Sequence, residues 1–232
     1  MELFFIRHGQ SANNALADPS QRVQDPLLTP AGETQAERVA EHIAAGLHLV
    51  GGNVGEQDRP PLDRLCCSAM IRAMQTARPI GQALGIAPEV YIDIHEFGGI
   101  FLDRPDGGSD GFPGQTRAEM ERDFAGYTVP DAVGADGWWK GPRETEEAQR
   151  ERAARTARDL WARAESDERV GLVSHGDYLN LLLQILLGIK GGEGLYLYHR
   201  NTAITRIHLY ADGTSDLYYL NRTVHIEPDL MT

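Results

Sequence analysis

The chain opens with MELFFIRHG (residues 1–9), an apolar run that ends in an arginine, a histidine and a glycine. Residues 1–6 predict a buried first strand, which places Arg7 and His8 where that strand ends. In an open α/β sheet, ligands bind beyond the carboxyl ends of the strands. A second apolar run, residues 169–173, leads in the same way to His175 and a glycine. Two strand ends that each carry a histidine before a glycine indicate a binding site, because packing alone does not explain them.

The order of the predicted elements defines the fold class. Apolar runs typical of strands alternate with helical patterns, and residues 203–210 and 216–220 predict a closing hairpin with its turn at Asp212 and Gly213. This alternation predicts an α/β protein, a three-layer α/β/α sandwich with a mostly parallel central sheet. At 232 residues, the chain is expected to form a single domain, residues 1–232.

Local signals place the helices on the first half of the chain. Thr29 and Pro30 are a typical helix start. The apolar residues that follow recur at helical spacing and are expected to be buried: Ala36, Val39, Ala40, Ile43 and Leu47. Ser68 is expected to cap the helix that carries Arg72 in its first turn, and Pro79 is expected to kink or interrupt that helix.

Further along, residues 90–94 predict a strand and residues 144–165 a helix. Between them, residues 97–142 are rich in glycine, aspartate, proline and aromatic side chains, with a capping box at Thr116 and Glu119 that predicts a short helix. An irregular tract of this length inside a compact domain is typical of a functional segment. We therefore expect residues 97–142 to form an inserted lid.

Composition limits the possible functions. The net charge of −12 and the pI of about 5.1 argue against a general binder of nucleic acid or of anionic membranes. The two cysteines, Cys66 and Cys67, are adjacent on a predicted strand, so they should face opposite ways, unbonded and buried. No signal peptide is recognised, and the longest apolar stretch, residues 178–189, is too short for a membrane span. A soluble, cytoplasmic protein is expected. Its oligomeric state stays open, with a homodimer among the alternatives.

The residues at the strand ends predict phosphate chemistry. Arg7 and Arg72 can grip phosphate oxygens bidentately, which makes a phosphate monoester dianion the expected ligand. Nearby arginines keep His8 neutral, as a nucleophile requires, and attack on phosphorus gives a phosphohistidine. His175 and the arginines stabilise the phosphoryl oxygens in the in-line transition state. Glu96 is the carboxyl best placed to protonate the leaving alkoxide.

These motifs together resemble the histidine phosphatase superfamily, in its phosphoglycerate-mutase-like branch. The matching segments are Arg7-His8-Gly9, Ser11 to Asn14, Ser68 to Ala77, His95-Glu96, and Val173 to Gly176. By this resemblance, His8 is the phosphate acceptor and Glu96 the general acid and base. The phosphate pocket then consists of Arg7, Asn14, Arg72 and His175. The resemblance implies no metal, no organic cofactor and a small phosphorylated substrate.

Departures from the mutase pattern favour hydrolysis. True mutases usually carry a Glu and a Trp where this chain has Gln10 and Asn13, and residues 97–103 replace their segment rich in Tyr, Gly, Asn and Lys. Cofactor-dependent phosphoglycerate mutase therefore remains an alternative. A catalytically silent phosphate-binding module and a broad-specificity acid phosphatase are the others.

Some assignments stay open on the sequence alone. Glu89, Asp93 or Asp103 could replace Glu96 as the acid. Residues 138–140, Trp-Trp-Lys, could line the leaving-group side or simply pack the lid against the domain. The remaining histidines share no spacing, and no aspartate and histidine set has metal-ligand spacing. A metal-dependent phosphatase is therefore disfavoured.

Overall fold

A six-stranded sheet forms the centre of the molecule, which the computed structural model describes over residues 1–49, 59–190 and 194–232. The stretch at residues 51–61 is rich in glycine and proline and is expected to form a loop, but all of it except residues 59–61 lies outside the described residues. In sheet order, the strands are β3 (Glu89–Val90), β2 (Arg64–Cys67), β6 (Arg169–Ser174), β1 (Glu2–Arg7), β7 (Ile204–Leu209) and β8 (Ser215–Arg222). The first four run parallel, whereas β7 and β8 form the predicted antiparallel hairpin beside β1.

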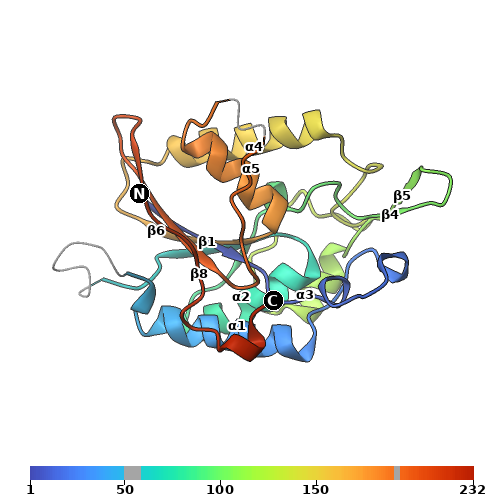
Figure 1. Ribbon diagram of the computed structural model, residues 1–232, viewed down its shortest axis with the longest axis horizontal. Coiled ribbons are helices and arrows are strands. Elements are labelled where there is room, and N and C mark those ends of the chain that lie inside the picture. Colours follow the sequence, from blue (N-terminus) through green and yellow to red (C-terminus); the bar gives the residue numbers. More distant parts are fainter. Residues whose placement is uncertain (50–58, 191–193) are drawn as a thin grey trace.

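Helices cover both faces of this sheet (Figure 1). On one face lie α1 (Pro30–Ala44), α2 (Ile71–Leu84) and α3 (Arg117–Asp123), and on the other lie α4 (Glu146–Trp161) and α5 (Gly176–Leu186). Short 3-10 turns connect the elements: η1 (Ala12–Asn14), η2 (Pro19–Gln21), η3 (Leu47–Leu49), η5 (Ile92–Ile94) and η6 (Pro228–Leu230). The molecule is thus the predicted three-layer α/β/α sandwich with a mostly parallel sheet.

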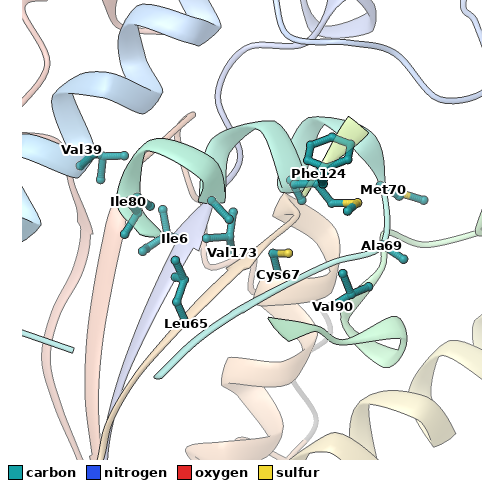
Figure 2. Close-up of a cluster of buried hydrophobic side chains, with 14 of the residues drawn as sticks. Ile6, Val39, Leu65, Cys67, Ala69, Met70, Ile80, Val90, Phe124 and Val173 are labelled. Atoms are coloured by element: carbon teal, nitrogen blue, oxygen red, sulfur yellow. The ribbon is translucent and has the colours of Figure 1, made fainter. Parts of the chain in front are cut away.

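Two apolar clusters hold the layers together, one on each face of the sheet. Successive residues of a strand point to opposite faces, so Phe4 packs toward α1 and α2 while Phe5 packs toward α4 and α5. Cys67 lies in the first cluster (Figure 2) and Cys66 in the second. Both thiols are free and buried, as the sequence predicts.

The start of α2 differs from its prediction. The helix begins at Ile71 with Met70 as its N-cap, and no side chain caps it. The Ser68 hydroxyl instead accepts a hydrogen bond from the Met70 amide at 3.2 Å and contacts His175. Arg72 still lies in the first turn, and α2 continues through Pro79 to Leu84, so this proline does not interrupt the helix.

Three other predictions extend an element beyond its observed end. The strand expected over residues 90–94 is limited to Glu89–Val90, because the chain then turns into η5 and inserts Ile94 into the core, where its carbonyl accepts the Ser174 hydroxyl at 2.6 Å. The helix expected to end near residue 165 ends at Trp161. Leu47 falls beyond the end of α1 and is 53% exposed.

Residues 97–142 contain two kinds of structure. The hairpin of β4 (Phe101–Asp103) and β5 (Ser109–Gly111) extends away from the sheet (Figure 1), whereas the following part carries buried side chains such as Phe124 and Val133. The capping box opens α3 as predicted. The tryptophan rings of residues 138 and 139 lie 5.3 and 5.0 Å from the ring of His95, so they pack the segment against the domain. That the segment acts as a lid stays a prediction.

A search of the described residues finds no helix that is both long enough and apolar enough to cross a membrane.

Candidate active site

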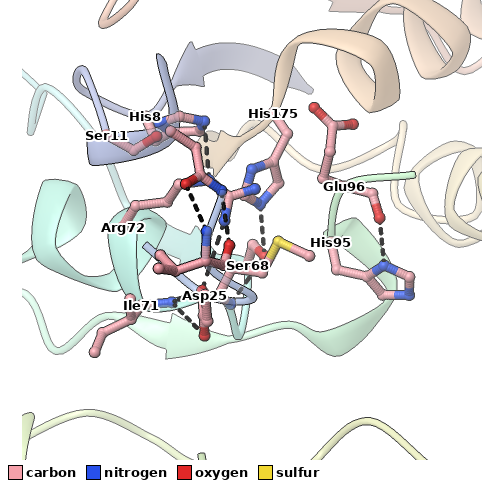
Figure 3. A network of polar contacts seen from close by, with 12 residues as sticks. His8, Ser11, Asp25, Ser68, Ile71, Arg72, His95, Glu96 and His175 are labelled. Carbon is pink, nitrogen blue, oxygen red and sulfur yellow. Dashed lines mark hydrogen bonds and ion pairs between the residues drawn. The ribbon is translucent and has the colours of Figure 1, made fainter. Parts of the chain in front are cut away.

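The predicted site residues converge because their strands are neighbours. β6 lies between β2 and β1, so the carboxyl ends of these three strands share one edge of the sheet. The His8 amide donates to the Ser174 carbonyl at 2.9 Å, and the Ser68 amide donates to the Val173 carbonyl at 3.0 Å. These two hydrogen bonds tie the segments after β1 and β2 to the end of β6. His8, Arg72, Glu96 and His175 therefore lie together (Figure 3).

The contacts of His8 define one tautomer. Its Nδ1 lies 2.6 Å from the carbonyl oxygen of Gly9, which can only accept, so Nδ1 carries the proton. Nε2 then holds the lone pair and accepts a hydrogen bond from Nε of Arg72 at 3.2 Å. Burial, followed by the positive charges of Arg72 and Arg7, lowers the pKa of His8 well below its usual value. His8 is therefore a neutral base whose Nε2 can attack.

His175 faces His8, with 5.0 Å between the ring centroids. Its Nε2 lies 2.8 Å from the Ser68 hydroxyl, and its Nδ1 is buried without a hydrogen-bond partner among the described residues. Burial first, and then the charge of Arg72, lowers the pKa of His175 well below its usual value. The second histidine is thus also neutral and keeps one ring nitrogen unpaired.

Two arginines add positive charge. Arg7 donates from Nη1 to the His199 carbonyl at 2.7 Å, while its Nε is buried and lacks a partner within the described part of the chain. Arg72 is buried, and its Nη1 lies 3.6 Å from Oδ1 of Asp25. Two guanidinium groups and two neutral imidazoles are groups that can donate hydrogen bonds to an anion in this corner of the molecule.

Glu96 follows η5, and its side chain lies against the first turn of α5. Its Oε1 accepts hydrogen bonds from the amides of Phe97 and Tyr178, both at 3.0 Å. Burial, and then the nearby carboxylate of Asp177, raises the pKa of Glu96. A carboxyl group whose pKa is raised is suited to donate a proton near neutral pH.

The competing carboxylates lie elsewhere or are paired. Glu89 forms an ion pair with Arg64, and Asp93 lies 3.6 Å from Nε of Arg155; neither lines the site cavity. Asp103 lies at the cavity wall, but it pairs with Arg143 at 2.9 Å. The geometry therefore favours Glu96 among the candidates.

A cavity of about 560 Å³ opens onto these groups. Of the six predicted site residues, five line it: Arg7, His8, Asn14, Arg72 and Glu96. The sixth, His175, is followed by the lining residue Gly176. Asn14 accepts the Ser11 amide and hydroxyl through Oδ1, at 3.2 and 3.1 Å, so its NH₂ group is the part that remains to donate to a ligand. The cavity is far larger than one phosphoryl group and leaves room for an organic group.

Sequence reasoning missed several residues of this site. Asp25 pairs with Arg72, the Ser68 hydroxyl contacts His175, and Asn201 donates from Nδ2 to the His8 carbonyl at 2.8 Å. Tyr196 lines the cavity and donates its hydroxyl proton to Asp177 at 2.5 Å. These residues lie on loops or were assigned another role, and no periodic pattern marks them. Among the described residues, no group of three or more His, Cys, Asp or Glu side chains is placed to hold a metal ion.

Comparisons with known proteins agree with this geometry. A family model, the histidine phosphatase superfamily (branch 1), matches residues 3–222. The probable phosphoglycerate mutase GpmB of Yersinia enterocolitica is 26% identical over 213 residues, which cover 89% of this chain and 84% of that protein. A PE-PGRS family protein of Mycobacterium tuberculosis is 35% identical over 102 residues, which span 44% of this chain but only 15% of that much longer protein.

Among solved structures, a mycobacterial glucosyl-3-phosphoglycerate phosphatase superposes with a TM-score of 0.61 at 22% identity. The alignment covers 96% of this chain and 99% of that one, which shows a shared fold. The family model matches nearly the whole chain, and the five segments that carry the resemblance each contribute residues to the lining of one cavity. The chain therefore belongs to the histidine phosphatase superfamily, branch 1.

Proposed function

We propose that the protein hydrolyses a phosphate monoester of a small organic molecule through a phosphohistidine on Nε2 of His8. One observation carries the proposal: Nε of Arg7 and Nδ1 of His175 are buried without partners in the described structure, beside a neutral His8. Buried polar groups in proteins are nearly always hydrogen-bonded. A phosphate dianion beside His8 would supply the oxygens that both nitrogens lack.

The first half-reaction transfers the phosphoryl group to the enzyme. Nε2 of His8 attacks phosphorus, the N–P bond forms, and the bond between phosphorus and the ester oxygen breaks. Arg7, Arg72 and the NH₂ of Asn14 bind the equatorial oxygens. The Ser68 hydroxyl accepts a hydrogen bond from the Met70 amide and can donate its own O–H to Nε2 of His175. In that tautomer the proton of His175 is on Nδ1, which donates a hydrogen bond to the phosphoryl group. Glu96 gives its proton to the departing alkoxide.

The second half-reaction returns the enzyme to its starting state. Glu96, now a carboxylate, takes a proton from a water molecule as that water attacks phosphorus. The N–P bond breaks, its electron pair returns to Nε2 of His8, and inorganic phosphate leaves. The enzyme is unchanged, and the balance needs only ester and water.

Phosphoglycerate mutase activity is the second candidate, because a relative that matches this chain over most of its length is a probable phosphoglycerate mutase. Hydrolysis is favoured by Gln10, Asn13 and residues 97–103, where the mutase pattern is absent. Phosphoglycerate interconversion that depends on priming by 2,3-bisphosphoglycerate would establish the mutase instead.

Hydrolysis of p-nitrophenyl phosphate between pH 5 and 8, with EDTA present, tests the proposal. Wild type should turn over, and His8→Ala should lose roughly 10³-fold or more of that activity, since the nucleophile is gone. His208→Ala is the matched control, because His208 pairs with Glu2 at the amino end of β1, whereas His8 follows the carboxyl end of that strand. Full activity in His8→Ala, or activity abolished by EDTA, would refute the proposal.

A further inference from the structure

Asp25 lies in the loop between η1 and α1, which forms one wall of the cavity through residues such as Arg22 and Pro26. The loop is tied down at both ends. The side chain of Asn13 exchanges two hydrogen bonds with the backbone of Val23, at 2.8 and 3.0 Å. Near its other end, the Leu28 amide donates to Oε1 of Gln75 on α2, at 2.9 Å. The loop therefore presents Asp25 to α2 in a defined position.

The Asp25 carboxylate meets the start of α2 in two ways. Its oxygens accept the Ile71 amide at 3.3 and 3.4 Å, and Oδ1 lies 3.6 Å from Nη1 of Arg72 (Figure 3). The side chains of Asp25 and Arg72 are only 12% and 10% exposed. An ion pair this sheltered is screened weakly, so it holds its geometry better than a surface pair.

We propose that Asp25 is a positioning residue for Arg72. It holds Nη1 of the guanidinium so that Nε faces His8 and the remaining N–H groups face the transferred phosphoryl group. The inference rests on the proposed function, because it assigns a role in phosphoryl transfer. Asp25 itself does not line the cavity and acts only through Arg72.

The need for such a residue follows from the geometry of Arg72. The arginine side chain has many rotamers, and a phosphoryl group passing through an in-line transition state needs its donors fixed in direction. Nε of Arg72 donates a hydrogen bond to Nε2 of His8 at 3.2 Å. This hydrogen bond must break when Nε2 of His8 attacks phosphorus. Asp25 is the contact of Arg72 that can persist through the reaction.

Charges around the pair come from several elements. Arg72 on α2 faces Asp25 directly, while Arg22 on the same loop, Arg7 at the end of β1 and Glu96 act on Arg72. Burial raises the pKa of Asp25 to about 6, against the opposing effect of Arg72. Asp25 is therefore ionised above about pH 6, and the ionised form is the one that holds Arg72.

The experiment compares wild type, Asp25→Asn and Asp25→Glu on p-nitrophenyl phosphate as a function of pH. Asparagine keeps an acceptor for the Ile71 amide but removes the charge. We expect kcat of Asp25→Asn to fall roughly 10- to 100-fold above pH 6.5, with KM and the inhibition constant of inorganic phosphate changed less than about threefold. Asp25→Glu, which restores the charge, should recover part of kcat.

The ratio of wild-type kcat to that of Asp25→Asn should itself depend on pH. It should approach one well below pH 6, where Asp25 is protonated and resembles asparagine, and level off above that pH. Ionisation of the substrate is common to both enzymes and cancels in the ratio. A purely structural role would lower activity equally at every pH, and such a flat ratio would overturn the proposal.

Two further measurements separate the possible failures. Asp18→Asn is the matched control, because Asp18 lies exposed on the same loop and contacts Ser20 rather than Arg72; it should behave as wild type. A crystal structure of Asp25→Asn should show Arg72 displaced from Nε2 of His8. If wild type fails to hydrolyse the ester, the proposed function falls, yet that crystal structure still decides the role of Asp25. An unmoved Arg72 would refute it.

Discussion

Arginines gather at both ends of β1, but their charges are paired in different ways. At the amino end, Glu2 forms ion pairs with Arg169 and Arg206, whose side chains are 2% and 0% exposed. At the carboxyl end, Arg7 and Arg72 lie beside two neutral histidines, and no carboxylate bridges the two arginines in the described structure.

The carboxylates at the two ends reflect this difference. Burial alone would raise the pKa of Glu2, but the hydrogen bond and charge of Arg206, together with Arg169, lower it below its usual value. The pKa of Glu96 moves upward, because burial and Asp177 outweigh the amides that bind it. At the amino end, one ionised carboxylate bridges two buried arginines, a contact that we expect to support the fold. At the carboxyl end, Asp25 pairs with Arg72 alone, and Glu96 is an acid that can give up its proton, as the proposed phosphatase requires.

The same substitution at the two ends separates these roles, and the larger expected effect is at Glu96. Glu96→Gln keeps the acceptor for the amides of Phe97 and Tyr178 but cannot donate a proton. We expect kcat to fall about 10²- to 10⁴-fold on an alkyl phosphate, the usual range for general acid catalysis. The loss should be smaller on p-nitrophenyl phosphate, because nitrophenolate leaves without a proton. Steady-state kinetics on both esters measure the difference.

Thermal unfolding provides the control for Glu96→Gln. A carboxyl group whose pKa is raised by folding stabilises the protein below its usual pKa, and this contribution is lost as the pH rises through the raised value. The glutamine variant should therefore be at least as stable as wild type at pH 8. Equal losses of kcat on the two esters, or a marked loss of stability, would contradict the assignment of Glu96 as the acid.

At the other end, Glu2→Gln should change stability and leave catalysis intact. The substitution removes the buried carboxylate that pairs with Arg169 and Arg206, and breaking a buried ion pair typically costs about 3–5 kcal/mol of unfolding free energy. Because folding lowers the pKa of Glu2, the difference from wild type should be full above the usual pKa of a glutamate and shrink as the pH falls through the lowered value. Denaturant unfolding at pH 7 and at pH 3 measures both.

The matched control is Glu168→Gln, which removes a carboxylate from a surface pair with Arg163 and should cost less than about 1 kcal/mol. A Glu2→Gln variant as stable as this control would show that the amino-end cluster does not support the fold. A loss of kcat in Glu2→Gln at a temperature where the variant stays folded would contradict the prediction, because it would show that Glu2 also affects catalysis.

The sequence alone predicts the positions of those candidate-site residues that lie at strand ends. Arg7, His8 and His175 follow apolar runs, and parallel strands bring such positions to one edge whatever the details of the packing. The sequence correctly predicts Arg72 in the first turn of α2, but its prediction that Ser68 caps that helix is wrong. The Ser68 hydroxyl is a hydrogen-bond partner of His175, because the N-cap position falls at Met70 instead.

The rest of the site depends on tertiary contacts that no local pattern marks. Asp25 meets Arg72 only because the loop after η1 folds back onto α2. Tyr196 reaches Asp177 from a loop beyond α5. The strand predicted at residues 90–94 extends beyond the observed β3. Because β3 is an edge strand, the alternation of apolar residues does not show where its pairing with β2 stops.

The central claim is that Nε2 of His8 carries the phosphoryl group. Enzyme mixed rapidly with p-nitrophenyl phosphate and quenched in base, where phosphohistidine survives, should yield a phosphoenzyme that ³¹P NMR and peptide mapping assign to Nε2 of His8. The proton on Nδ1, held by the Gly9 carbonyl at 2.6 Å, is the reason to expect Nε2. A phosphoryl group on Nδ1, on another residue, or absent throughout turnover would contradict the mechanism.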